Sequence, residues 1–371
     1  MGTTQRPSRI EIDLGALKYN IQSIRSLLKP GVKFMAVVKA DAYGHGAGIV
    51  SRVAEENGAD YLGVAFIEEA DEIREAGVKS PIAILYPETP ERNIEAAARG
   101  YHISVSSLGE IDRLKKALGR KSKDLKYFIK INTGMNRYGM DADPENMEKI
   151  MKNGPPGDGL VGFNTNLADP MMTREDLSKR QVERFIKFMK SAAGFSNNGL
   201  VFSYEASGSI WEKGAVEGSL VRVGLLMYGV APDRKRRLGL KPAMSVKSRI
   251  AEIHVLRKGD GVGYGFSYIA GRNSKAAVIP VGYADGYPWA LSNKGSVIIG
   301  GRMAPVIGRV CMDAFMVDIS GIEGARVGDD VILMGSQGDH TIDANTLGEW
   351  AGSFAYEILS GWGKRMPRVY L

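Results

Sequence analysis

The sequence predicts the α/β fold class, with an N-terminal (β/α)8 TIM barrel followed by a C-terminal, mostly β domain. Three observations carry this prediction. The chain has 371 residues, more than the roughly 250 to 300 that one hydrophobic core usually holds, so two domains are expected. Strand-like and helical segments alternate through the first part of the chain. Beyond it, short alternating strands with dense glycine take over.

Eight short apolar runs indicate the barrel strands, and eight is the number that this barrel requires. In chain order they are KFMAVVK, YLGVAF, PIAILY, YHISVSS, LKYFIKIN, LVGFNTNL, GLVFSYEAS and LVRVGLLMYG. The patterns between them space apolar residues by three and four, and most end at glycine, as helices do: EEADEIREAGV, ERNIEAAARG, GEIDRLKKALG, PENMEKIMKNG and REDLSKRQVERFIKFMKSAAG. Because parallel strands need crossover connections, the alternation predicts a parallel sheet that closes on itself.

The boundary between the domains is expected near residues 238–242, which gives a barrel over residues 1–240 and a β domain over residues 241–371. Short alternating strands are indicated in KAAVIPVGYADGYP, SVIIGGRMAPVIGRVCMDAFMVDIS and VGDDVILMG. The sequence contains no fixed-period repeat and no low-complexity segment.

The composition predicts a soluble, cytoplasmic protein. The hydrophobic fraction of 44% and the charged fraction of 25% are ordinary, and no run approaches the ~18 apolar residues of a membrane span. The N-terminal residues lack the apolar core of a secretory signal. Cys311 is the single cysteine and the four histidines are scattered, so we expect neither a disulfide framework nor a metal site.

The net charge of +7 raises the question of nucleic-acid binding. Most basic residues interleave with acidic ones, as on solvated helix faces. The one dense basic run, DRKRR at residues 233–237, reads more simply as a solvated loop between the domains. We therefore expect no nucleic-acid partner and no membrane partner.

Lys39 is the first candidate for chemistry. It directly follows the apolar run in MAVVKADAYGHGAG and so lies at the carboxyl end of the first barrel strand. In barrels this end carries the ligands and catalytic groups. A lysine amine can form an imine with an aldehyde if it is partly unprotonated. A salt-bridged lysine at a strand end is the alternative, and position alone favours that alternative.

The segment AVVKADAYGHG resembles the cofactor-lysine motif of the alanine racemase family, pyridoxal-phosphate enzymes with a barrel followed by a β domain. The resemblance continues, in order, through KINTGMNRYG, LVRVGLLMYG, LKPAMSVKSRI, GVGYGFSYIA, VIPVGYADGYP, GRVCMDAFMVDIS and AYEILSGWGKRMPRVY. It implies an isomerase that interconverts L- and D-alanine and supplies D-alanine for peptidoglycan. The cofactor implied is pyridoxal 5'-phosphate.

The resemblance implies two catalytic residues that act on opposite faces of the substrate. Lys39 would carry the cofactor covalently and, once freed, move a proton at Cα, while Tyr264 of the GYG block would serve the other face from a second copy of the chain. A homodimer with shared active sites follows. Tyrosine has a reference pKa of about 10, so Tyr264 would need nearby positive charge or hydrogen bonds to act near neutrality.

The resemblance also assigns the cofactor-binding residues. Arg222 would face the pyridine nitrogen, and a guanidinium has no proton to lend it. The phosphate would be held by Tyr43, Ser207, the backbone at Gly224 and Leu225, and Tyr356. The fold rule that barrels bind phosphate after the seventh and eighth strands agrees with Ser207 and Gly224 independently.

The substrate carboxylate would meet the planar fork of Arg137 and the backbone N–H of Met312. Asp313 belongs to the CMD segment that, with Tyr356, narrows the pocket in relatives. Lys130 matches a lysine that can be carbamylated in this family, and a plain lysine paired with an acid is the alternative for that position.

Three positions depart from the family pattern. Asn166 stands where a histidine is usual, Ala206 replaces an asparagine before the phosphate-binding serine, and Asn132 replaces an acid. Changes around a site alter rate and selectivity before they abolish a reaction. Racemisation of serine, lysine, ornithine or several amino acids on the same scaffold is therefore the alternative to alanine.

Two rival functions differ in kind. A non-catalytic cofactor carrier resembles only the barrel half, whereas this chain also has the β-domain blocks. Decarboxylation on the same fold does not explain a second proton donor, and metal-assisted elimination would need a His and Cys pair that the sequence lacks.

Overall fold

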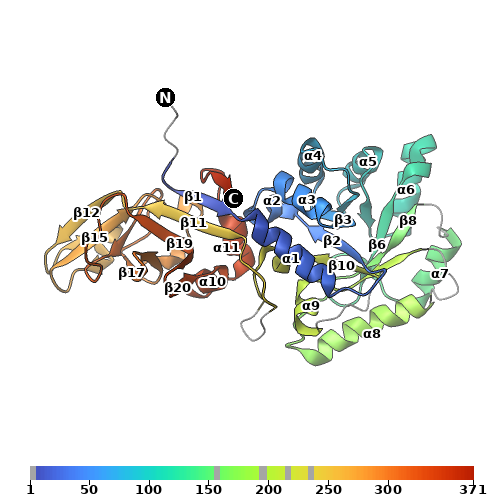
Figure 1. Ribbon diagram of the computed structural model, residues 1–371. Helices are drawn as coiled ribbons and strands as arrows, with labels where there is room; N and C mark the ends of the chain where they lie inside the picture. Colours follow the sequence, from blue (N-terminus) through green and yellow to red (C-terminus); the bar gives the residue numbers. More distant parts are fainter. Residues whose placement is uncertain (1–5, 154–158, 192–198, 214–218, 233–237) are drawn as a thin grey trace.

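The computed structural model describes residues 6–153, 159–191, 199–213, 219–232 and 238–371, which form two domains side by side (Figure 1). The basic run at residues 233–237 lies outside the described residues. Within the described part of the chain, no helix has the length and apolarity needed to cross a bilayer.

All eight predicted barrel strands are present and parallel. They pair in two groups, β10-β2-β3-β4 and β5-β6-β8-β9. Two single bridges, Ala83 to His102 and Ala206 to Arg222, join these groups into a closed barrel. The strands are β2 (Lys33–Val37), β3 (Tyr61–Val64), β4 (Ile82–Ile84), β5 (Ile103–Val105), β6 (Tyr127–Asn132), β8 (Leu160–Asn164), β9 (Val201–Ser203) and β10 (Leu220–Val223). The short β7 (Met140–Asp141) pairs with β6.

Helices surround the barrel strands (Figure 1). They are α1 (Leu14–Ser26), α2 (Lys39–Gly44), α3 (Ala47–Glu56), α4 (Ile67–Glu75), α5 (Pro90–Ala98), α6 (Leu108–Leu118), α7 (Pro144–Asn153), α8 (Glu175–Ser191) and α9 (Ser207–Lys213), with 3-10 turns η1 (Gly119–Asp124) and η3 (Leu225–Tyr228). In α1, Leu17, Ile21 and Ile24 are buried at spacings of four and three, the apolar stripe that the periodicity of a helix requires.

Side chains fill the inside of the barrel, so a ligand must bind at its end. One buried layer consists of Met35, Tyr61, Ala83, Phe128, Val201 and Leu220, which come from six different strands. Such packed layers are usual inside eight-stranded barrels. The polar residues of the predicted site therefore gather at the carboxyl edge of the strands.

The C-terminal domain is built on one large sheet with the order β12-β15-β18-β17-β16-β19-β11-β1-β21. Its C-terminal strands are β11 (Met244–Arg249), β12 (Glu252–Leu256), β15 (Ser274–Ile279), β16 (Ser296–Ile299), β17 (Arg302–Ile307), β18 (Phe315–Asp318), β19 (Asp330–Gln337), β20 (His340–Ile342) and β21 (Arg368–Tyr370). The domain also contains a hairpin, three 3-10 turns and two helices. These are the hairpin of β13 (Gly261–Val262) and β14 (Tyr268–Ile269), the turns η4 (Tyr264–Phe266), η5 (Tyr283–Asp285) and η6 (Trp289–Leu291), and the helices α10 (Ala344–Ala351) and α11 (Ala355–Gly361).

The first strand of the chain belongs to this second sheet. β1 (Arg9–Ile12) pairs antiparallel with β11 and parallel with β21, so the expectation that residues 1–240 form only the barrel does not describe this strand. Just before β1, the Arg6 guanidinium donates to both carboxylate oxygens of the fully buried Asp285, at 2.6 and 2.7 Å. The start of the chain thus ties the β domain to the barrel.

Candidate active site

Lys39 lies where the sequence predicts it, immediately past the carboxyl end of β2. The strand ends at Val37, and Lys39 is the first residue of α2. Its side chain is half-buried, and its Nζ donates to the hydroxyl of Tyr86 at 2.9 Å. The buried strand fixes the backbone, and the amine points to a polar partner at the same edge of the barrel.

The segment after Lys39 is a left-handed turn rather than the ordinary loop that the sequence predicts. Ala40, Asp41, Ala42 and Tyr43 have φ values of 53°, 53°, 52° and 53°. L-residues rarely adopt this conformation, which costs roughly 1–2 kcal/mol for each residue. The Asp41 carboxylate stabilises the turn by accepting from the backbone N–H of Ala47 at 2.8 Å.

Strand β21 of the other domain also holds this turn. Arg368 Nε donates to the carbonyl of Gly44 at 3.0 Å, and its Nη2 lies 3.3 Å from the carboxylate of Asp41. Gly46 has a φ of +96°, and a Cβ at that position would lie 2.0 Å from the Tyr370 hydroxyl. Only glycine allows this contact, so the β domain packs directly on the segment that presents Lys39.

His45 closes the turn from inside. Its Nδ1 lies 3.0 Å from the carbonyl oxygens of both Ala42 and Tyr43, so this nitrogen carries the proton. The ring is fully buried and stacks on Tyr228 with 4.4 Å between ring centres. Burial lowers the pKa of His45 to about 4, and the nearby Arg368 charge adds to this effect.

The residues predicted to hold the phosphate lie together. The backbone N–H of Gly224 donates to Ser207 Oγ at 3.1 Å, and a Cβ on Gly224 would lie 2.6 Å from the Tyr43 hydroxyl. The rings of Tyr43 and Tyr356 are 5.8 Å apart. Leu225 begins the 3-10 turn that follows Gly224. The hydroxyls of Ser207 and Tyr43 thus lie close to the backbone of Gly224, where a larger residue would collide with Tyr43.

Arg222 lies on β10 among the ends of β8 and β9. Its guanidinium donates to the Thr165 carbonyl at 2.6 Å, to the Ser203 carbonyl at 3.0 Å and to the Ser203 hydroxyl. Burial lowers the pKa of Arg222 to about 10, so the side chain stays protonated near neutrality. The Arg222 guanidinium is therefore a cation held in place by neutral oxygen acceptors.

Lys130 and Asn166 are hydrogen-bonded to each other. Lys130 Nζ donates to Asn166 Oδ1 at 2.8 Å, to Asn164 Oδ1 at 3.4 Å and to the Leu85 carbonyl at 3.5 Å. These partners in the described chain are amide and carbonyl oxygens, so the predicted alternative of a lysine paired with an acid is not what the structure contains. Burial and three nearby cations, Arg222, Arg137 and Lys39, move the pKa of Lys130 well below its ordinary value.

Tyr86 is the member of this cluster that the sequence did not reveal. It follows β4, and around its ring lie Lys39 Nζ, Lys130 Nζ and Arg137 Cζ at 5.0, 5.5 and 5.2 Å from the ring centre. The one feature of the sequence that could have pointed to Tyr86 is its position at the carboxyl end of the barrel strand in PIAILY. Arg137 itself is exposed at the edge of the cluster.

Tyr264, Met312 and Asp313 lie on the β domain, and no contact in the described residues joins them to Lys39. Tyr264 begins η4 and is 71% exposed, and Met312 is 51% exposed. The Asp313 carboxylate accepts from Arg365 Nη2 at 2.7 Å. Within one chain, the predicted site is therefore divided between two separate surfaces.

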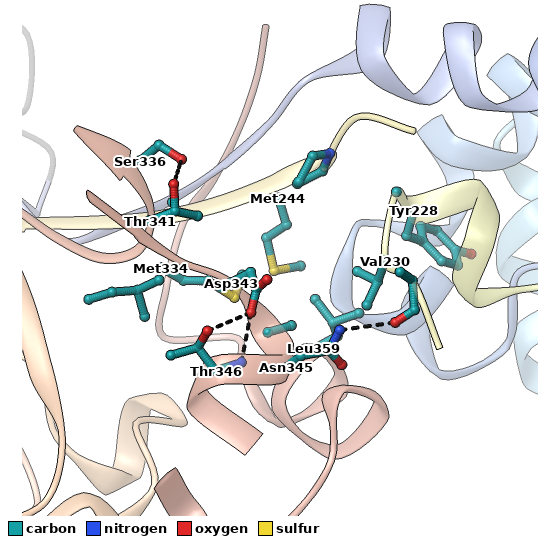
Figure 2. Close-up of a pocket in the computed structure, with 16 residues that line it drawn as sticks. Tyr228, Val230, Met244, Met334, Ser336, Thr341, Asp343, Asn345, Thr346 and Leu359 are labelled. Atoms are coloured by element: carbon teal, nitrogen blue, oxygen red, sulfur yellow. Dashed lines mark hydrogen bonds between the residues drawn. The ribbon is translucent and has the colours of Figure 1, made fainter. Parts of the chain in front are cut away.

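A cavity of about 420 Å³ at the junction of the domains is distinct from the Lys39 cluster (Figure 2). Its walls include Tyr228, Met244 and Leu359, together with the start of α10, where Asn345 Nδ2 donates to the Ala231 carbonyl at 2.9 Å. None of the predicted site residues is among the described residues that line it. The Tyr228 ring, 5.0 Å from that of Tyr43, separates it from the phosphate-binding residues.

The residues present fit pyridoxal 5'-phosphate. The hydroxyls of Ser207 and Tyr43 lie next to the backbone of Gly224 and are neutral donors of the kind that a phosphate accepts from. Lys39 supplies an amine at the same barrel edge, and Arg222 supplies a permanent cation for a ring nitrogen. In the described residues no cluster of three or more His, Cys, Asp or Glu side chains is arranged to hold a metal ion.

Comparisons with known proteins agree with this geometry along the whole chain. Residues 12–232 match the family described as alanine racemase, N-terminal domain, and residues 243–370 match alanine racemase, C-terminal domain. Alanine racemase 2 of Caldanaerobacter subterraneus subsp. tengcongensis is 34% identical over 371 residues, which cover 99% of this chain and 95% of that protein. The alanine racemase of Thermodesulfovibrio yellowstonii is 36% identical over 367 residues, 97% of each chain.

A solved structure gives the same result. Alanine racemase from Bacillus anthracis with bound L-Ala-P has a TM-score of 0.90 to this chain at 30% identity, covering 100% of this chain and 96% of the other. A barrel with a lysine and a phosphate-binding turn at its carboxyl edge, followed by a β domain, defines a class of pyridoxal-phosphate enzymes. The chain belongs to the alanine racemase family, which confirms the resemblance and the predicted fold. Members of this family are isomerases that use pyridoxal 5'-phosphate and act on amino acids.

The pKa of His45 predicts a loss of stability in acid. An ordinary histidine titrates near 6.5 and His45 near 4. Between these pH values the unfolded chain binds a proton that the folded chain does not, so stability falls as the pH falls. The free energy of unfolding lost by pH 4 through this residue is at most about 3 kcal/mol. Urea unfolding at several pH values between 4 and 6.5 measures this. The free energy of unfolding of His45→Phe should depend less on pH than that of the wild type, and an equal dependence would contradict the lowered pKa of His45.

His102 provides the matched comparison. Its pKa is also lowered to about 4, by burial and by Lys126 and Lys33, but it directly precedes β5 and so lies at the opposite edge of the barrel. His102→Phe should flatten the same pH range without affecting cofactor retention. His45→Phe should also weaken cofactor retention, because the carbonyls of Ala42 and Tyr43 lose their donor.

Proposed function

We propose that this chain is a racemase that interconverts L- and D-alanine with pyridoxal 5'-phosphate and so supplies D-alanine for peptidoglycan. The observation that carries the proposal is the grouping of Lys39, Arg222 and the Gly224–Ser207 contact at one barrel edge, in a chain that matches both domains of the family over nearly its whole length. Two copies share their active sites in this proposal.

Lys39 holds the cofactor and moves a proton at the substrate Cα from one face. Tyr264 of a second copy moves a proton on the opposite face, so inversion needs both residues. When bound, the cofactor takes up the electron pair left at Cα, which makes this weakly acidic position reactive. The Arg309 guanidinium lies beside Gly265, the residue after Tyr264.

The other residues bind and orient. Tyr43, Ser207, Tyr356 and the N–H groups of Gly224 and Leu225 hold the phosphate. Arg222 faces the pyridine nitrogen as a cation that lends no proton.

Arg137 and the N–H of Met312 receive the substrate carboxylate. Asp313 narrows the pocket, and its ion pair with Arg365 fixes that side chain. Asn166 holds Lys130 where the family has a histidine.

The exposed apolar residues of the β domain support a dimer. Tyr264, Phe266, Trp289 and Met312 are 71%, 70%, 55% and 51% exposed. Their loops are connected, because Asn293 Nδ2 donates to Ser267 Oγ at 3.2 Å and Ser292 Oγ accepts from the N–H of Val310 at 3.0 Å. A patch of this kind is typical of an interaction surface. We infer that it meets the barrel edge of a second copy.

Alanine is favoured over serine, lysine and ornithine, because the relatives reported above are alanine racemases along their whole length. We expect the purified holoenzyme to invert L-alanine faster than it inverts the other three amino acids. Chiral chromatography after incubation with each L-amino acid measures this, and uptake of deuterium at Cα in heavy water provides a second readout. Faster inversion of another amino acid would replace alanine as the substrate.

Mixing two inactive variants tests the shared site. Lys39→Ala and Tyr264→Phe should each lose activity, because each removes one of the two proton-transfer groups. If subunits exchange freely at equal concentrations, half the dimers are mixed and each has one intact site, so about a quarter of the wild-type activity should return. If each active site lies within one chain, mixing restores nothing.

Lys130 is expected to form a carbamate. A neutral amine adds to the carbon of CO2, an N–C bond forms, and one proton leaves to water, giving an anion among three cations. The low pKa of Lys130 favours the required neutral form. With ¹³C-bicarbonate, the NMR spectrum should contain a carbamate signal that Lys130→Met abolishes. Lys33→Met is the control, because Lys33 begins β2 at the opposite edge of the barrel. A plain lysine at position 130 gives no signal.

A further inference from the structure

Tyr86 makes the closest polar contact with the proposed catalytic lysine. Its hydroxyl lies 2.9 Å from Lys39 Nζ, and this hydrogen bond joins the ends of β2 and β4, the strands on either side of β3. The ring is half-buried and packs against Tyr138, with 5.7 Å between ring centres. The side chain is therefore held in place on both its polar and its apolar side.

Two lysine amines and one guanidinium surround the same ring. Lys39 follows β2, whereas Lys130 lies on β6 and Arg137 in the segment after β6, and each lies within 5.5 Å of the ring centre. Like charges this close repel one another in a partly buried site, whereas the face of an aromatic ring attracts each of them. The Tyr86 ring is thus the common neighbour of all three side chains.

The charge of the cluster acts on the phenol in turn. Burial raises the pKa of Tyr86, but the Lys39 charge and hydrogen bond, followed by Arg137 and Arg222, lower it, and the net shift is downward. A hydroxyl can accept from a lysine ammonium and donate to a neutral amine. Lys39 therefore keeps a partner in either protonation state.

We propose that Tyr86 is a positioning residue of the racemase site, whose hydroxyl orients the Lys39 amine and whose ring sets the spacing of Lys130 and Arg137. This inference rests on the proposed function, and it assigns separate tasks to two parts of one side chain. The hydroxyl governs proton transfer on the Lys39 face. The ring governs how Arg137 presents its guanidinium to a carboxylate.

Two variants of the holoenzyme separate these tasks. Tyr86→Phe keeps the ring, so kcat for alanine should fall about tenfold while KM stays within about twofold. Tyr86→Leu removes the ring as well, so KM should rise in addition. If Tyr86→Phe and Tyr86→Leu change kcat and KM alike, the separate roles of hydroxyl and ring are wrong.

The isotope effect distinguishes positioning of Lys39 from general packing. Lys39 serves one face of the substrate, so Tyr86→Phe should raise the α-deuterium isotope effect in the direction in which Lys39 removes the Cα proton. It should lower the effect in the other direction, because delivery of a proton by Lys39 then limits the rate. Equal changes in both directions would assign Tyr86 a structural role and overturn the proposal.

A titration of the full chain without cofactor tests the contact independently of activity. In ultraviolet difference spectra, the wild-type protein should have one phenol that ionises before the others. Tyr86→Phe should remove this phenol, and Lys39→Ala should move it to higher pH. If it persists in Tyr86→Phe, or does not move in Lys39→Ala, the proposal fails. Failure of the proposed function would instead appear as a wild-type holoenzyme that inverts no amino acid.

Tyr19→Phe is the matched control for the titration. Tyr19 also lies against a lysine, with Lys241 Nζ 4.5 Å from its ring centre, but it is on α1 at the surface. Removing its hydroxyl should leave the early-ionising phenol and the kinetics unchanged. Loss of that phenol in Tyr19→Phe would assign it to the wrong residue and overturn the proposal.

Discussion

The left-handed turn at residues 40–43 is the constraint on which the site depends. Its four non-glycine residues together cost several kcal/mol, at about 1–2 kcal/mol each. Contacts from both domains offset this cost: His45 from inside, and Arg368 and Tyr370 from β21. The turn carries Lys39 at one end and Tyr43 at the other. The β domain is therefore a structural part of the barrel site even within a single chain.

The site also depends on an excess of positive charge. Lys39, Lys130, Arg137 and Arg222 lie near one another. In the described residues, the hydrogen-bond partners of Lys39, Lys130 and Arg222 are hydroxyl, amide and carbonyl oxygens. Neutral acceptors satisfy the N–H donors but leave the net charge in place. Anions such as a phosphate and a substrate carboxylate complete such a site, and a carbamate on Lys130 would reduce the charge further. Tyr86 is the common neighbour of three of these side chains, Lys39, Lys130 and Arg137.

The sequence predicted the barrel because its signals are local. Each strand is an apolar run, and alternation with helical patterns leaves few possible folds. Strand β1 escaped prediction because its four residues pair with β11 and β21, which lie far along the chain. The left-handed turn gave no signal because Ala40, Asp41 and Ala42 are ordinary residues whose conformation is imposed by distant contacts.

The site residues also divide into those with a local sequence signal and those that only distant contacts reveal. Lys39 was evident from a motif and its position at a strand end, whereas Tyr86 matched no motif and became visible only through its contact with Lys39. Tyr264 was found by resemblance, and within one chain it remains on an exposed surface away from Lys39. In each chain the two proposed proton-transfer groups lie apart, Lys39 at the barrel edge and Tyr264 on the β domain. One chain therefore carries two incomplete halves of the proposed site. In the dimer that we propose, pairing two copies would bring these halves together twice. The exposed patch around Tyr264 and the open edge of the barrel would then be the two sides of one interface.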